Sequence, residues 1–288
     1  MGQGHESRSI RPGLTKAGPG QPESTGPDLV DSAGRRTCIQ SPDLRGAPQP
    51  RQPSSSRHAG PACGGGVWWQ RSPRAYKNAI TNELFIELTA WLHNSIGGDV
   101  KYLRWAEAEW SWFDHSEMIN SSNLVNDSLD DTCENNADIT WTYNQGVILA
   151  GLAQLYQATG NRTLLSAGER IAWAAIGQLT VGGVLAEPCE GTGCADRLDA
   201  NTQSFKGIFV RDLKALAVTA GTTQFNAFFT GQAQSIEAHD TGHNLEFGMF
   251  WTGPVADVSP ASQASALDAV VASVELPRAA PVPLTTAG

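Results

Sequence analysis

Residues 140–158 read TWTYNQGVILAGLAQLYQA, and this stretch decides the fold class. Drawn as a helix, it is apolar over most of its circumference. A helix of that kind is buried, because an exposed helix would keep a polar face. The stretch therefore predicts a central helix that other elements surround.

Helical patterns also lie on both sides of this stretch. Residues 78–94 place Ile80, Leu84, Leu88 and Trp91 at steps of four, four and three along one face. Asn161 has the residue type and the position of an N-cap for the helix that follows. Because alternation typical of strands is nearly absent, we expect an all-α architecture of antiparallel helix pairs. Besides residues 78–94, the predicted helices cover residues 100–114, 140–158, 161–179, 202–218 and 223–238.

The N-terminal end differs in composition from the rest of the 288 residues. Residues 1–62 hold nine prolines, no aromatic residue, and 8 Lys and Arg against 5 Asp and Glu. Such a stretch cannot bury enough apolar surface to offset the entropy of ordering its backbone. We expect a disordered tail over residues 1–62, one helical domain over 63–271 and a C-terminal tail over 272–288.

The body that follows this tail is acidic, with 12 basic and 24 acidic side chains. An electrostatic field of that sign repels polyanions, which argues against a nucleic-acid partner. No run of 18 apolar residues occurs, so we expect no membrane-spanning helix. The first residues also lack the apolar core of a secretory signal.

Three N-x-Ser/Thr triplets begin at Asn120, Asn126 and Asn161. They are candidate acceptors of N-linked glycans, which would place the chain in the secretory pathway. Such triplets also arise by chance, and that alternative stays open.

Five cysteines occur in the chain. Cys189 and Cys194, in CEGTGC, are close enough in sequence to close a small loop, so we expect a disulfide between them and an oxidising compartment. No other pair of Cys or His has the spacing of metal ligands, so no metal site is expected. Cys63 and Cys133 are a second candidate pair, which leaves Cys38 unpaired.

The segment of residues 120–138 is too long for a plain connector and is rich in Asp, Asn and Ser. Within it, Asp127 is followed by the doublet Asp130 and Asp131. Two neighbouring carboxyl groups, one with a raised pKa, can act as acid and nucleophile on a glycosidic bond. Asp130 and Asp131 are therefore catalytic candidates, with a solvated rim, a helix cap and a cation site as the alternatives.

Aromatic side chains follow this acidic segment. Trp141, Tyr143 and Asn144 open the predicted central helix. Sugar rings stack on aromatic faces while Asp and Asn side chains bind sugar hydroxyls, so these three residues and the three aspartates are predicted to bind carbohydrate. Core packing is the alternative, and it is the better interpretation for Trp105 and Trp110, which lie on helical faces.

Other chemistries lack their sequence signatures. No serine lies in a nucleophile elbow, and the six histidines are scattered. The glycines of CGGGVWW have no Lys-Ser/Thr after them, so they do not form a nucleotide-binding loop. No cofactor is expected.

Several longer segments occur in an order that is specific to one family. Together they resemble glycoside hydrolase family 76, the fungal and bacterial endo-α-1,6-mannanases and their cell-wall relatives, from about residue 63 to residue 271. The resemblance implies an (α/α)6 toroid, α-1,6-mannan as the partner, a retaining mechanism with two adjacent aspartates, and a secreted or cell-wall location. The segments are CGGGVWWQ, YKNAITNELFIELTAWL, YLRWAEAEWSWF, MINSSNLVNDSLDDTCENN, TWTYNQGVILAGLAQLYQATGN, QSFKGIFVRDL and FGMFWTGP.

One departure from the family concerns the aspartate pair. In family members this pair lies upstream of the stretch that CGGGVWWQ matches, where this chain has residues 1–62, so the resemblance gives no catalytic role to Asp130 and Asp131. A toroid has twelve helices and the patterns predict half of them. We therefore expect about half a ring, with little or no mannanase turnover. The alternatives are a mannan-binding half-toroid without activity and a transglycosidase of cell-wall mannan.

Overall fold

The computed structural model describes residues 62–72, 74, 76–97, 99–191, 198–274 and 276, together with residues 29–30 and 36–37. The chain divides into two units, residues 1–42 and 43–288, which are treated separately. In the first unit, β1 (Leu29–Val30) pairs with β2 (Arg36–Thr37) in antiparallel register. These strands depart from the expected absence of regular structure in residues 1–62; the rest of that tail, up to residue 61, lies outside the described residues.

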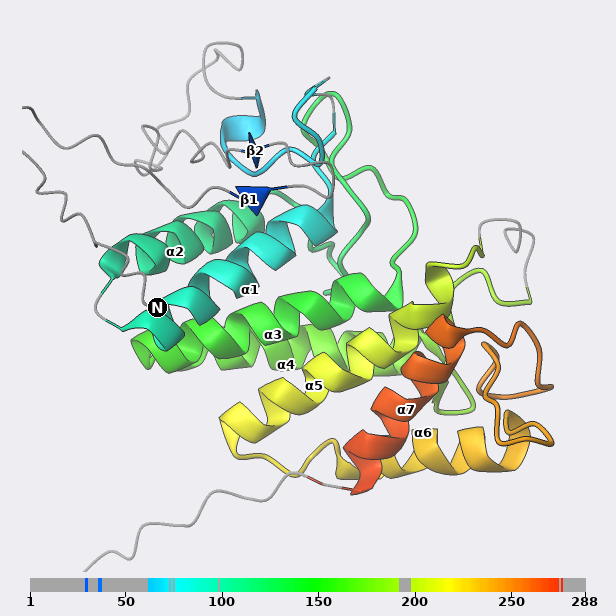
Figure 1. The fold of residues 1–288 in the computed structure, drawn as a ribbon. Helices are drawn as coiled ribbons and strands as arrows, with labels where there is room; N and C mark the ends of the chain where they lie inside the picture. Colours follow the sequence, from blue (N-terminus) through cyan, green and yellow to red (C-terminus); the bar gives the residue numbers. More distant parts are fainter. Residues whose placement is uncertain are drawn as a thin grey trace, which may run out of the picture. The chain divides into compact units, whose positions relative to one another are not determined.

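The described part of the second unit is mainly helical, which confirms the predicted all-α fold (Figure 1). Each of the six predicted helices is present, with ends that differ by a few residues. A seventh helix, α7 (Pro260–Val274), is not predicted from the sequence. Its buried face consists of Ser and Ala instead of large apolar residues. It also extends into the predicted C-terminal tail. The helices are α1 (Ala79–Ile96), α2 (Val100–His115), α3 (Thr142–Thr159), α4 (Arg162–Gln178), α5 (Phe205–Ala220), α6 (Asn226–His239) and α7 (Pro260–Val274).

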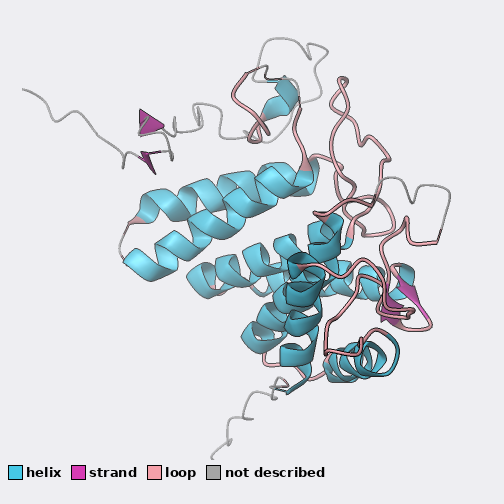
Figure 2. Ribbon diagram, turned by 45° about the vertical axis from the view of Figure 1, so that its right-hand side comes forward, coloured by secondary structure: helices cyan, strands magenta, loops and turns pink. Residues whose placement is uncertain are grey.

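The helices form two layers, and successive helices of the chain lie in different layers. One layer is the row α1, α3, α5 and α7, in which each helix packs against the next. In the other layer α2 packs on α1, α4 on α3 and α6 on α7 (Figures 1 and 2). Short elements complete the described part: two 3-10 turns, η1 (Ala62–Gly64) and η3 (Thr202–Ser204), and an antiparallel ladder of β3 (Thr180–Val181) with β4 (Val184–Leu185).

Helix α3 is the centre of the core, as its sequence predicts. It packs against both α1 and α5, and most of its residues are buried. Close approach to α5 depends on Gly146, because a Cβ added there would lie 2.6 Å from the Cα of Phe209. Gly207 has the same role between α5 and α7, where an added Cβ would lie 2.5 Å from the Cα of Ser265. Any larger residue at these positions would push the helices apart.

The glycine-rich segment before α1 packs against α2. Gly66 has φ 80°, and a Cβ added to it would lie 2.3 Å from the ring of Trp112. The indole Nε1 of Trp112 donates to the backbone oxygen of Cys63 at 2.8 Å. A disulfide joins Cys63 to Cys133, so the second cysteine pair offered by the sequence is present.

Only one cysteine of the other predicted disulfide, Cys189, lies among the described residues. Cys189 is buried and disulfide-bonded. Cys194 and Cys38 lie outside the described residues, so the Cys189–Cys194 pairing stays a prediction. Within the described ranges, no helix combines the length and the apolar character needed to cross a membrane.

Candidate functional site

The acidic segment between α2 and α3 folds back onto the residues that precede α1. The backbone nitrogen of Ala79 donates to the backbone oxygen of Asp127 at 2.8 Å. The side chain of Gln145, on α3, exchanges two hydrogen bonds with the backbone of Val125, at 2.7 and 2.8 Å. The segment is therefore held where α1 and α3 begin.

Two tyrosines and a carboxylate meet at these helix ends. The hydroxyl of Tyr76 donates to Oδ2 of Asp127. The ring of Tyr143 lies 4.0 Å from that of Phe205, at the start of α5, measured between centroids. Burial, and then the hydrogen bond with Asp127, raise the pKa of Tyr76 to about 12. Burial, followed by nearby carboxyl groups, also raises the pKa of Tyr143, so both hydroxyls stay protonated and can donate hydrogen bonds.

Glu83, on α1, is fully buried and close enough to Asp127 for the charge of Asp127 to act on it. Neither of its carboxyl oxygens has a hydrogen-bond partner in the described part of the chain. Burial raises the pKa of Glu83 well above its usual range, and the charge of Asp127 raises it further, so the folded state favours the neutral form of this carboxyl group. We name Tyr76, Glu83, Asp127 and Tyr143 the tyrosine–carboxylate cluster.

Glu83→Gln is expected to stabilise the protein increasingly as the pH rises. The pKa of Glu83 is raised in the folded state, so its contribution is fully present below the unfolded pKa of about 4.5 and is lost as the pH rises toward the folded pKa. Wild type should lose about 1.4 kcal/mol per pH unit in that window relative to the variant. Urea unfolding of both proteins at pH 4, 6 and 8 measures the difference. A difference that stays constant with pH would contradict the assignment.

A second buried carboxyl group holds the start of α3. Glu187 accepts hydrogen bonds from the backbone nitrogen of Thr142 at 3.1 Å and from its hydroxyl. Burial raises the pKa of Glu187 to about 7, although the two bonds from Thr142 oppose the shift. The bonds satisfy backbone and side-chain donors at the N-terminus of α3, next to Tyr143.

Lys206 ties the loop that contains Glu187 to the start of α5. Its Nζ atom lies 2.5 Å from Oε1 of Glu190 and 2.6 Å from the backbone oxygen of Met249. Nζ also lies 5.2 Å from the ring centroid of Trp251, which is a cation–π distance. Lys206 follows Phe205 in the sequence, so this ion pair lies next to the residue whose ring packs against Tyr143.

Asp130 and Asp131, the predicted catalytic candidates, lie on an exposed turn. Oδ1 of Asp130 accepts hydrogen bonds from the backbone and hydroxyl of Thr132 and from the backbone nitrogen of Glu134. These bonds, led by the one from the Thr132 hydroxyl, lower the pKa of Asp130. These are the contacts of a turn-forming residue at an exposed position. Such a position is the one that the solvated-rim alternative describes.

The predicted sugar ligands separate in the structure. Asp127 and Tyr143 belong to the tyrosine–carboxylate cluster and are partly exposed. Trp141 is buried, with its ring 5.7 Å from that of Phe205 in an edge-on contact, and Asn144 is also buried. A sugar can therefore reach the first two residues more readily than the last two; their role as ligands stays a prediction.

Several residues of the site are not predicted from the sequence. Tyr76 and Phe205 come from separate segments, and no local pattern connects them with Asp127 or Tyr143. Glu83 did leave a signal, since it is an acidic residue at a buried position of an apolar helix pattern. A buried charge of that kind marks either a functional site or a paired structural group.

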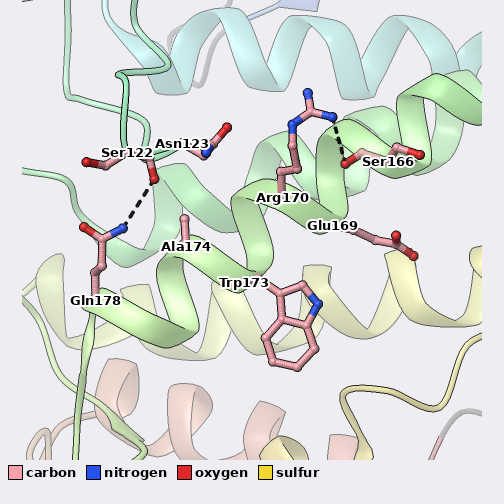
Figure 3. Close-up of a pocket in the computed structure, with 8 residues that line it drawn as sticks. All are labelled: Ser122, Asn123, Ser166, Glu169, Arg170, Trp173, Ala174 and Gln178. Atoms are coloured by element: carbon pink, nitrogen blue, oxygen red, sulfur yellow. Dashed lines mark hydrogen bonds between the residues drawn. The ribbon is translucent and has the colours of Figure 1, made fainter.

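Two surface hollows lie away from the tyrosine–carboxylate cluster. One of about 720 Å³ lies over α4, where Gln178 donates to the backbone oxygen of Ser122 at 3.3 Å (Figure 3). Another of about 610 Å³ lies beside Asn120 and Asn126. No member of the tyrosine–carboxylate cluster lines either hollow, and we place the candidate site on the cluster because of its chemistry. Over the residues that the structure covers, no three His, Cys, Asp or Glu side chains gather as metal ligands.

Solved structures with the same helix arrangement define the class of fold. The GH76A alpha-1,6-mannanase from Salegentibacter sp. HEL1_6 matches with a TM-score of 0.63 and 26% identity, over 73% of this chain and 62% of that chain. The fold is accordingly that of the α/α-toroid glycoside hydrolases. The model of glycosyl hydrolase family 76 matches residues 51–286, and the chain belongs to this family. The match confirms the resemblance seen in the sequence and extends beyond both ends of residues 63–271.

Curated relatives agree with this assignment. Mannan endo-1,6-alpha-mannosidase DCW1 of Saccharomyces cerevisiae is 29% identical over 76% of this chain and 51% of its own length. Mannan endo-1,6-alpha-mannosidase DFG5 of Candida albicans is 30% identical over 52% of this chain and 35% of its own length. The chain spans about half the length of DCW1 and a smaller share of DFG5.

Proposed function

We propose that the protein acts on α-1,6-linked mannan and that the tyrosine–carboxylate cluster binds the sugar. Two sets of relatives support this choice of substrate. DCW1 is a mannan endo-1,6-alpha-mannosidase, and an inactive variant of the Salegentibacter mannanase was solved in complex with alpha-1,6-mannotriose. The observation that carries the proposal is the Tyr76–Asp127 hydrogen bond next to the Tyr143–Phe205 ring pair.

Each group has a distinct role in this proposal. The carboxylate of Asp127 accepts hydrogen bonds from sugar hydroxyls, and Tyr76 holds that carboxylate in place. The Tyr143 hydroxyl donates to the sugar, and its ring offers an apolar face for the sugar's C–H groups. Phe205 and the ion pair of Lys206 keep the Tyr143 ring in position.

The proposed reaction is cleavage of α-1,6-mannosidic bonds, the activity named for the relatives. Asp130 and Asp131 are the only adjacent aspartates in the chain. We propose that they do not act as nucleophile and acid, because both lie on an exposed turn and Oδ1 of Asp130 is engaged in the contacts of that turn. For chain 1–288 alone, we propose binding with little turnover. Products longer than the substrate would indicate transfer, shorter ones hydrolysis.

Asp127→Asn should weaken binding of α-1,6-mannotriose by roughly 10- to 150-fold, which corresponds to about 1.5–3 kcal/mol for hydrogen bonds to a charged group. Asp130→Asn is the matched control, since it makes the same change on the same loop in an exposed turn, and it should change affinity by less than about twofold. Titration calorimetry measures both. Equal losses, or a larger loss for Asp130→Asn, would refute the assignment of the cluster.

We also propose a secreted or cell-wall location. The Cys63–Cys133 disulfide supports it, because such bonds persist in oxidising compartments. Fractionation of the source cells, with mass spectrometry of a non-reduced digest, tests the location. A reduced protein confined to the cytosol would contradict it.

A further inference from the structure

We propose that Asn161 carries an N-linked glycan, and that Asn120 and Asn126 stay unmodified in the folded protein. All three begin an acceptor triplet, so the sequence does not distinguish them. The distinction comes from what each side-chain amide already binds. The inference is independent of any action on mannan.

Asn161 lies in the turn that joins α3 to α4. Residues 159–163 are all exposed. Oδ1 of Asn161 accepts hydrogen bonds from the Thr163 backbone at 3.1 Å and from the Thr163 hydroxyl at 2.8 Å. Its Nδ2 atom, the one to which a glycan would be attached, has no hydrogen-bond acceptor within the described ranges, and the residue lies in an exposed turn.

Asn126 is the opposite case. It is 6% exposed, and its Nδ2 donates to the backbone oxygen of Asp138. Oδ1 of Asn126 accepts from Nδ2 of Asn120 at 2.8 Å and from Nδ2 of Asn135 at 3.1 Å. A glycan on Asn126 would not fit beside the buried groups that surround this amide. A glycan on Asn120 would replace one hydrogen of the Nδ2 that donates to Asn126, and the remaining hydrogen would have to keep that bond. Both modifications are therefore disfavoured in this loop, whereas the Nδ2 of Asn161 makes no such bond in the described residues.

The modification needs one co-reactant, a lipid-diphosphate-linked oligosaccharide. Nδ2 of Asn161 forms a bond to C1 of the first sugar and loses one proton. The bond from C1 to the phosphate oxygen breaks, and its electron pair leaves with the lipid diphosphate. No oxidant or reductant takes part.

A glycan at Asn161 would lie far from the candidate site. The tyrosine–carboxylate cluster is at the start of α3, and Asn161 follows its end. A helix of 18 residues spans about 27 Å at about 1.5 Å per residue. The glycan would therefore cover the opposite end of the helix row and leave the cluster open.

The test uses the full chain, secreted from a yeast host behind a secretion leader. N-glycans are released enzymatically in ¹⁸O-water, which labels each formerly glycosylated asparagine as aspartate, and peptides are mapped by mass spectrometry. We expect one glycan per secreted chain, with the label on Asn161. The glycan should be lost in Asn161→Gln and in Thr163→Ala, and kept in the conservative Thr163→Ser and in the matched control Asn126→Gln.

Label on Asn120 or Asn126 in the secreted, soluble chain would overturn the proposal. So would secreted chain in which Asn161 carries no label. The map of wild type decides between these results even where Asn126→Gln fails to fold. The readout involves no mannan, so a failure here is separate from a failure of the proposed function.

Discussion

Replacing Cys63 and Cys133 together with serine should lower the free energy of unfolding by about 4 kcal/mol. The disulfide joins residues separated by 70 positions, and a crosslink over a loop of that length removes much of the entropy of the unfolded chain. It also joins the glycine-rich segment under Trp112 to the loop that contains Asp127. Urea denaturation of wild type and variant, followed by tryptophan fluorescence, measures the loss.

An alanine pair at the same positions is the matched control. Alanine and serine differ in polarity but both remove the crosslink, so the two variants should lose similar amounts of stability. A loss below about 1 kcal/mol in both would show that the loop is held by its other contacts. Mannotriose binding should weaken in parallel, because the loop that places Asp127 is then tied only by hydrogen bonds.

Lys206→Ala should lower the free energy of unfolding by about 3–5 kcal/mol, the range for removing one partner of a buried ion pair. Lys206 and Glu190 have side chains only 1% and 8% exposed. The variant leaves the Glu190 carboxylate without its counter-ion and the Met249 oxygen without its donor. Asp240, whose pKa burial raises to about 7, also loses a nearby positive charge. Chemical denaturation at pH 7 measures the effect.

Two further variants make this expectation specific. Lys101→Ala removes an exposed lysine and should cost less than about 1 kcal/mol. The double change Lys206→Met with Glu190→Gln removes both charges and keeps an acceptor for the backbone nitrogen of Glu187, so it should regain more than half of the lost stability. If Lys206→Ala is as mild as Lys101→Ala, the ion pair does not hold the start of α5.

Much of the fold follows from local sequence. The central helix, the five other predicted helices and the cap at Asn161 all rest on periodicity and on residue types within a few turns. The family assignment rests on segments in a fixed order, each of which is also local. Helix α7 shows the limit, because Ser265 and Ala266 bury well but give no large apolar signal.

The sequence by itself determined the helical class, the order of the helices and the family, because apolar periodicity is written within single segments. Only the tertiary structure decided which of the neighbouring aspartates joins the site. Asp127 accepts a hydrogen bond from Tyr76 and its charge raises the pKa of Tyr143, whereas Asp130 accepts a hydrogen bond from Thr132, although the two aspartates are three residues apart. The physical reason is that a side chain's partners depend on segments distant in sequence, and these come together only when the helices pack.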